Sequence, residues 1–208
     1  GAVFNAGPTV DRGAGGTLTN AGTLNVGSAG KVATTTLTGN LVQLSGGTLY
    51  IDADMASGVS DKLNVSGSAK IGGTVRVAAS NITNRAVKVL TAAGGVTLDP
   101  ALAMADSSHR YDFKSTVSGK DLMVSAVANF AKRASTFGAN EQAVAGNLQS
   151  LFDGGASADK VFGRLMSISD DAGYAAALGE ISGRALGSFG SFRFNSSRTF
   201  AANLYGGC

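Results

Sequence analysis

The chain has 208 residues, of which 30 are glycine, and only 15% of its side chains are charged. Because 44% of the residues are hydrophobic, it is not the charge-rich, apolar-poor kind of chain that stays unfolded, and its glycines do not follow the period of three of collagen. Its 17 basic and 14 acidic side chains leave a net charge of +3, without a basic cluster of the kind that binds nucleic acid, so no nucleic-acid partner is expected.

Few side chains could hold a metal ion or form a crosslink. The single cysteine, Cys208, cannot make an internal disulfide, and with the single histidine, His109, it cannot build a His/Cys metal cluster. We therefore expect neither a metal nor a cofactor. No run of about 18 apolar residues occurs, so no membrane-spanning helix is expected. The first residues carry no secretory signal, and we expect the chain to be a piece of a longer protein.

The first fifty residues contain a dipeptide, Thr-Leu, that recurs between glycines and asparagines. A strand of four or five residues cannot bury an apolar face alone, but stacked copies share a continuous core, and Gly and Asn suit the corners. We therefore predict rungs of a parallel β-helix over residues 1–84, with about 20 residues in each turn. The recurring phrase is Thr-Leu, at Thr17-Leu18, Thr23-Leu24, Thr36-Leu37 and Thr48-Leu49.

Further along, apolar and polar residues alternate with a period of two, as in Leu49–Asp54 and Ile71–Val77, which is typical of strands. A coil with an open end exposes unpaired strand edges, so its terminal turn needs a cap of different structure. We assign this cap to residues 85–127 and expect it to consist of antiparallel strands.

Near residue 128 the hydrophobic period changes from two to 3.6, which predicts a helical region over 128–208. A stripe of apolar residues forms the first helix, and the third helix begins at Ser169 or Asp170. The last helical segment, Arg184–Tyr205, contains three arginines and no acidic residue.

The best candidates for catalysis are Asp52 and Asp54, which lie two residues apart on a strand and therefore on one face. Two such carboxylates could share a proton or a cation and cleave a polysaccharide, but a solvated outer face explains them better. His109 lies in a polar loop without an evident partner. Because nucleotide-binding loops and nucleophile motifs are also missing, we expect that the chain is not an enzyme.

Several motifs follow one another between about residue 40 and the end of the chain. The most specific runs from Asp61 to Val77: it begins with Asp61-Lys62-Leu63 and includes the turn Gly67-Ser68-Ala69-Lys70-Ile71-Gly72-Gly73. The other segments are 46–52, 87–90, 119–124, 140–148, 174–182 and 197–200. Together they resemble the C-terminal part of the passenger of pertactin-like autotransporters of type V secretion, including the junction and the linker ahead of the barrel.

The resemblance implies a mainly β fold: a right-handed parallel β-helix, a β-strand autochaperone cap that nucleates its folding outside the cell, and an α-helical linker. The implied partners are its own translocator barrel and an upstream passenger, both missing from this sequence, as well as the outer-membrane assembly machinery and host-surface ligands. The implied location is the bacterial cell surface or outer membrane, reached through the periplasm.

These expectations assign roles to named residues. Core-facing aliphatic residues would form the autochaperone core, with two glycines permitting a turn, and their burial would favour outward movement without ATP at about 25 cal/mol per Å². The core set is Leu49, Ile51, Leu63, Val65, Ile71, Gly72, Gly73, Val75, Val77 and Leu122. The residues of the linker in the barrel lumen are Arg184, Arg193, Arg198 and Phe200. An alternative function is a surface adhesin or glycan-binding module that uses the Thr/Asn-rich face of residues 15–50.

Overall fold

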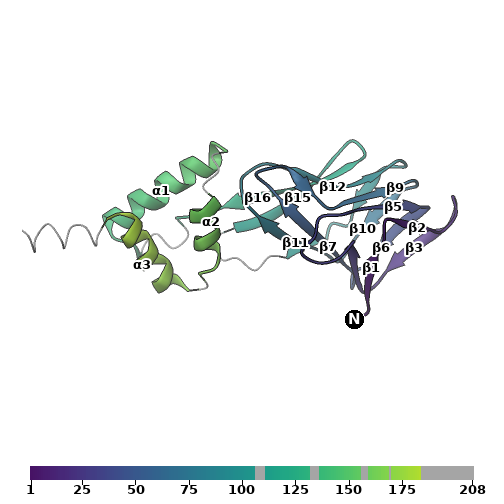
Figure 1. Cartoon of the computed structure of the whole chain (residues 1–208), viewed down its shortest axis with the longest axis horizontal. Helices are drawn as coiled ribbons and strands as arrows, with labels where there is room; N and C mark the ends of the chain where they lie inside the picture. The colour runs from purple at the N-terminus through teal and green to yellow at the C-terminus, as the bar shows by residue number, and fades with distance from the viewer. Residues whose placement is uncertain (106–110, 132–135, 156–158, 169, 184–208) are drawn as a thin grey trace, which may run out of the picture.

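The computed structural model describes residues 1–105, 111–131, 136–155, 159–168 and 170–183. The chain is mainly β and forms a parallel β-solenoid of about four turns, with helices at its C-terminal end (Figure 1). This confirms the predicted fold class. Among the described residues, the helices are all too short or too polar to cross a membrane.

Three parallel sheets form the faces of the coil, and each complete turn contributes one strand to each face. The first sheet contains β1 (Val3–Ala6), β4 (Thr23–Val26), β7 (Thr48–Asp54), β11 (Thr74–Ser80) and β14 (Ala103–Ala105), with β8 (Val59–Ser60) beside β7. The second sheet contains β2 (Thr9–Asp11), β5 (Thr34–Thr38), β9 (Lys62–Val65) and β12 (Val87–Ala92). The third sheet contains β3 (Thr17–Asn20), β6 (Asn40–Gln43), β10 (Ala69–Ile71) and β13 (Val96–Leu98).

The Thr-Leu phrases occur on all three faces, and in each of them the leucine is the more buried residue. Leu24 pairs in register with Leu49, and Leu49 with Val75, and none of these three side chains is more than 1% exposed. Leu37 is fully buried under the second sheet. Alternation along short strands thus places one aliphatic residue after another in a shared interior, as the sequence pattern predicts.

The turns lengthen along the chain instead of keeping one constant length. On the first sheet, each step between residues paired in register on successive strands is longer than the step before it. The paired residues are, in chain order, Val3, Thr23, Thr48, Thr74 and Ala103. Part of the extra length lies in connections between the first and second sheets. One of them, residues 27–33, is called the β4–β5 loop below.

The parallel coil continues beyond residue 84, into the segment predicted as the cap. β12 and β13 complete the fourth turn, and β14 pairs in parallel with β11. The antiparallel part is a hairpin of β15 (Tyr111–Ser118) and β16 (Asp121–Ala128), which extends the second sheet through β12. The chain continues the coil here because β12 and β13 keep the inward aliphatic pattern of the earlier turns.

Three helices follow the hairpin at the same end of the coil: α1 (Ala139–Asp153), α2 (Asp159–Met166) and α3 (Asp171–Ile181) (Figure 1). The N-cap of α3 is Asp170, one of the two predicted positions, and its carboxylate accepts a hydrogen bond of 2.7 Å from the backbone N–H of Gly173. The predicted segment Arg184–Tyr205 lies outside the described residues.

Candidate functional site

The predicted autochaperone core is a contiguous part of the interior of the coil. Its eight aliphatic side chains belong to one hydrophobic cluster, and none is more than 6% exposed. They come from β7, β9, β10, β11 and β16, so the structure brings the third turn, the fourth turn and the hairpin together. The eight residues are Leu49, Ile51, Leu63, Val65, Ile71, Val75, Val77 and Leu122.

The two glycines assigned to a turn form the corner between β10 and β11. Gly73 has a φ of +65°, and a Cβ atom there would collide with the carbonyl oxygen of Gly47 in the turn before. A Cβ at Gly72 would lie 3.0 Å from the carbonyl oxygen of Gln43. This corner therefore needs glycine for backbone conformation and for close approach of successive turns.

β12 has a different partner on each edge, which makes it the point where parallel pairing ends. Leu90 of β12 pairs in parallel with Leu63 and in antiparallel with Leu122, and all three side chains are at most 1% exposed. On the outer face, Asp121 accepts a hydrogen bond of 2.6 Å from Thr91. This bond is the main reason why the pKa of Asp121 is lowered.

The hairpin covers the end of the coil. β15 pairs with β16 on one side and also contacts β14 and β13, the last strands of the first and third sheets. Tyr111 and Phe113 of β15 point inward and are at most 5% exposed. The strand edges and apolar interior at this end are thereby shielded from solvent, which is what a capping element must do.

An aromatic cluster joins the hairpin to the helices, with Phe130 at its centre. The ring of Phe130 lies 5.4 Å from that of Tyr111 and 5.4 Å from that of Phe162 in α2. Its backbone N–H donates a hydrogen bond of 3.2 Å to Gln149 of α1, and its carbonyl oxygen accepts one of 3.0 Å from the hydroxyl of Tyr174 in α3. One residue thus contacts the hairpin and all three helices.

The helices also contact the solenoid itself. The side-chain amide of Asn84, in the connection between β11 and β12, donates a hydrogen bond of 2.7 Å to the carbonyl oxygen of Asp153 at the end of α1. Ile82 and Thr83, beside it in the chain, are at most 4% exposed. The fourth turn is therefore in contact with both the hairpin and α1.

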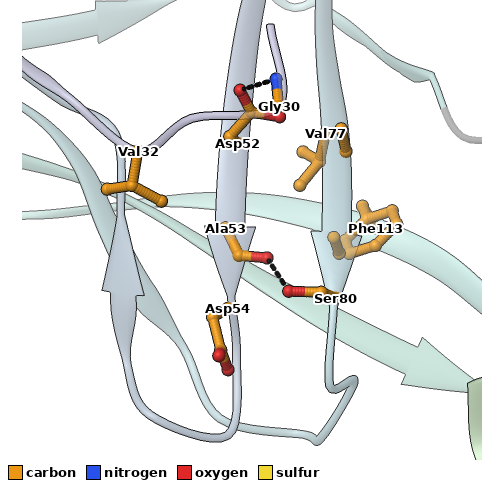
Figure 2. Close-up of a pocket in the computed structure, with 10 residues that line it drawn as sticks. Gly30, Val32, Asp52, Ala53, Asp54, Val77, Ser80 and Phe113 are labelled. Atoms are coloured by element: carbon orange, nitrogen blue, oxygen red, sulfur yellow. Dashed lines mark hydrogen bonds between the residues drawn. The ribbon is translucent and has the colours of Figure 1, made fainter.

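Two buried carboxylates, those of Asp52 and Asp61, hold the β4–β5 loop against the third turn, and Figure 2 shows the contact of Asp52 with Gly30. Asp52 Oδ2 accepts hydrogen bonds from the backbone N–H groups of Gly30, at 2.7 Å, and Lys31, at 3.2 Å. Asp61 Oδ1 accepts one of 2.7 Å from the N–H of Ala33, and its Oδ2 accepts one of 2.8 Å from the N–H of Asp52. Because Asp61 is fully buried, loss of solvation raises its pKa to about 6.

The carboxylates of Asp52 and Asp54 line one cavity of about 420 Å³ beside β7 and β11. Figure 2 shows them at different heights along β7, with Phe113 on the far side of β11. Asp54 accepts hydrogen bonds from the Ser57 backbone, at 3.1 Å, and from the Asn81 side chain, at 2.9 Å. The bond from Ser57 is the main cause of its lowered pKa. The hypothesis of a shared proton requires the two carboxylates to act on one group. In the structure, Asp52 and Asp54 accept hydrogen bonds from different donors.

Several residues of this end of the molecule were missed by the sequence reasoning. Asp61 was noted only as part of a motif, although its position two residues before the inward Leu63 places it on the buried face. Phe130, Tyr174 and Asn84 lie far apart in the sequence, so no local pattern shows that they belong to one region of the structure. The candidates Arg184, Arg193, Arg198, Phe200 and His109 lie outside the described residues.

Within the described residues, no group of three or more His, Cys, Asp or Glu side chains could hold a metal ion. No protein-family model matches the chain, and no curated protein is significantly similar to it.

Proposed function

We propose that this chain is the C-terminal, fold-nucleating end of a parallel β-helix that is displayed on a bacterial surface by type V secretion. The hairpin and the fourth turn act as the autochaperone, and the helical region connects the coil to an outer-membrane barrel. The observation that carries the proposal is the position of Leu90, which packs between Leu63 of the parallel coil and Leu122 of the hairpin. A coil with this ending has one closed end and one end at which further turns can be added.

The hairpin is expected to form faster than the parallel turns, because its strands are neighbours in the sequence. β15 and β16 are joined by only Gly119 and Lys120, whereas a whole turn of the coil separates the parallel partners Leu63 and Leu90. Closing a short loop costs less conformational entropy than closing a long one, and proteins rich in local contacts fold faster. The hairpin therefore forms first, β12 adds to it, and earlier turns stack upon β12 and its neighbours.

The proposed order of folding is tested by comparing two buried leucines in the full 208-residue chain. Leu122→Ala in the hairpin and Leu41→Ala in the second turn each remove a fully buried side chain, and each should cost about 2–5 kcal/mol of unfolding free energy. We expect Leu122→Ala to slow refolding and Leu41→Ala mainly to speed unfolding, as measured in stopped-flow denaturant jumps. Equal slowing of refolding by Leu41→Ala would contradict the proposal.

Surface display in a longer gene product tests the secretion part separately. There, Leu122→Ala should leave more of the passenger stalled in the periplasm and accessible to protease, because the template for outward folding is weakened. Leu41→Ala serves as the matched control with a similar cost in stability. Equal surface exposure of both variants would count against nucleation as the reason for the hairpin.

A second candidate function, an adhesin or glycan-binding module, is favoured by a column of polar side chains on the second sheet. Thr9, Thr36 and Asn64 are neighbours in register and all are exposed. The test is binding of the chain to a glycan array. Saturable binding that is lost in Thr36→Val but kept in Thr97→Val, an exposed position on the third sheet, would support this function, and silence on the array would reject it.

A further inference from the structure

Stacking of strands with the same alternation of inward and outward residues leaves the register of one turn on the next poorly determined by the hydrophobic pattern alone. β5 reads Thr34-Thr35-Thr36-Leu37-Thr38, with Thr35 and Leu37 inward and the other threonines at least partly exposed. If β5 shifts by two residues along β9, the same side chains still face the core and the solvent. The alternation of the strand therefore does little to disfavour such a shift. Another feature must select the observed pairing of Thr36 with Asn64.

Inward hydroxyls do not supply this selection. The buried hydroxyl of Thr35 donates its hydrogen bond, 2.9 Å long, to the carbonyl oxygen of Gly7, which belongs to the first turn and not to the third. It therefore aligns the second turn with the turn before it.

On the third sheet, the second turn is aligned on the third by the side-chain amide of Gln43, which donates hydrogen bonds to the carbonyl oxygens of Gly72 and Thr74. On the second sheet, the N–H of Gly39 donates a hydrogen bond of 2.9 Å to the hydroxyl of Ser66, just after the ends of β5 and β9. The groups that align the beginnings of these two strands belong to the third turn.

We propose that Asp61, assisted by Asp52, sets the register in which the second turn stacks on the third. Asp61 immediately precedes β9, and it receives the backbone N–H of Ala33, the residue immediately before β5. Next to this bond, the N–H of Lys62 donates to the carbonyl oxygen of Ala33 at 2.9 Å, which starts the ladder between the two strands. The carboxylate thus fixes the first pair of the β5–β9 ladder.

A slipped register would leave Oδ1 of the buried Asp61 without its donor, although Oδ2 would keep its bond from the N–H of Asp52. Asp61 is fully buried, and a two-residue shift of β5 would move the N–H of Ala33 by about 6.6 Å along the strand. A buried carboxylate oxygen that loses its donor carries a desolvation cost, so slipped states are disfavoured by on the order of tenfold to a hundredfold. The hydrogen bond between Asp61 and the N–H of Ala33 specifies one register of β5 on β9, where the apolar pattern allows several.

The β4–β5 loop also makes the choice of turn specific. Its conformation requires glycine at Gly30, with a φ of +81°, and it presents the N–H groups of Gly30 and Lys31 to Asp52. In the first turn the connection between β1 and β2 consists of only Gly7 and Pro8. That connection offers no comparable row of donors, so the carboxylates recognise the second turn and not the first.

This inference deepens the proposed function, because it names what the folded template recognises in the next turn to arrive, and it rests on that function only for the order of events. The register is tested at equilibrium by disulfide trapping in the full-length chain with Cys208→Ser. Thr36→Cys with Asn64→Cys reports the native register, and Thr34→Cys or Thr38→Cys with Asn64→Cys reports a slip in either direction. Residues two apart on the neighbouring strand are too distant to be bridged without such a slip.

In the parent background we expect only the native pair to crosslink after refolding under mild oxidation. Asp61→Asn should raise the yield of slipped crosslinks on the order of tenfold. A neutral amide loses less free energy than a carboxylate when its hydrogen bond from the N–H of Ala33 is broken. Asp54→Asn is the matched control, since that carboxylate lies near Asp52 on β7 but bonds to Ser57 and Asn81. Far-UV circular dichroism checks that each variant retains its strands.

Each outcome decides the proposal. The proposal is overturned if Asp61→Asn forms only the native crosslink and differs from the parent only by a lower unfolding free energy. Asp61 would then stabilise the fold without selecting the register. Equal slipping in Asp54→Asn would overturn the proposal as well. If Asp61→Asn does not fold, Asp52→Asn, which removes only the bonds to Gly30 and Lys31, must show slipped crosslinks for the proposal to stand. Failure of the refolding-rate comparison between Leu122→Ala and Leu41→Ala leaves these results unaffected.

Discussion

The hydroxyl of Tyr174 in α3 donates a hydrogen bond of 3.0 Å to the backbone carbonyl oxygen of Phe130, far earlier in the chain. Both side chains are fully buried, and the bond joins the last described helix to the segment that follows the capping hairpin. The helices therefore pack on the hairpin through a directional contact in addition to their apolar surface.

Replacing the tyrosine tests this contact directly. Tyr174→Phe keeps the ring but leaves the carbonyl oxygen of Phe130 without this donor, so we expect a loss of about 1–2 kcal/mol in unfolding free energy and faster amide exchange in α3. Urea unfolding and hydrogen exchange measure the two effects. Tyr50→Phe, on the half-exposed outer face of β7, should change stability by less than about 0.5 kcal/mol. Similar losses in both variants would contradict the assignment.

The aromatic cluster should respond strongly to truncation of Phe152. Its ring lies 5.6 Å from that of Tyr111 and 5.7 Å from that of Phe162, so Phe152→Ala opens a cavity between the hairpin and two helices. We expect a cost of about 3–5 kcal/mol in guanidinium unfolding. Leu151→Ala, at the adjacent and 48% exposed position of α1, should cost less than about 1 kcal/mol. If both variants cost the same, the helices do not pack on the hairpin as described.

The corner at Gly73 can be separated into strain and close approach by two alanine substitutions. Gly73 and Gly13 have φ angles of +65° and +75°, but a Cβ atom meets the carbonyl oxygen of Gly47 only at the former and open space at the latter. Gly13→Ala should therefore cost about 1 kcal/mol from backbone strain alone, and Gly73→Ala at least about 1 kcal/mol more. Thermal unfolding of both variants measures the difference. Equal melting temperatures would show that the turns need not approach closely there.

Because Asp61 is buried, we expect an unusual pH dependence of the free energy of unfolding. Its pKa is raised from 3.8 to about 6 by burial, so between these values the folded chain holds a proton that the unfolded chain has lost. The unfolding free energy should therefore fall, by at most about 3 kcal/mol, as pH rises from about 4 to about 6, and stay level above. Asp61→Asn should flatten this dependence in urea unfolding between pH 4.5 and 7.5.

Other carboxylates act outside this window. The pKa values of Asp54 and Asp121 are lowered, chiefly by hydrogen bonds from Ser57 and Thr91, so their stabilising contribution is lost only below the ordinary pKa of 3.8. Stability that increases with pH between 4.5 and 6 would contradict the burial of an ionisable Asp61.

The sequence by itself determined the parallel coil, because each Thr-Leu strand repeats the same local choice of an inward leucine. It also determined the interior position of residues such as Leu49 and Ile51 and the change to helices near residue 128, and it limited the cap of α3 to Ser169 or Asp170. Each of these depends on neighbours within a few positions, where residue spacing is translated directly into a face of a strand or helix.

Tertiary structure alone decided which outward residues are covered and where parallel pairing ends. Tyr50 and Asp52 share the outer face of β7, yet the first is half-buried and the second is only 7% exposed, because the β4–β5 loop lies over Asp52. Likewise, β12 has the inward aliphatic residues of an ordinary turn of the coil, and its role depends on which strand occupies its second edge. The paths of loops and the partners of edges depend on residues tens of positions away, so spacing along one strand does not encode them.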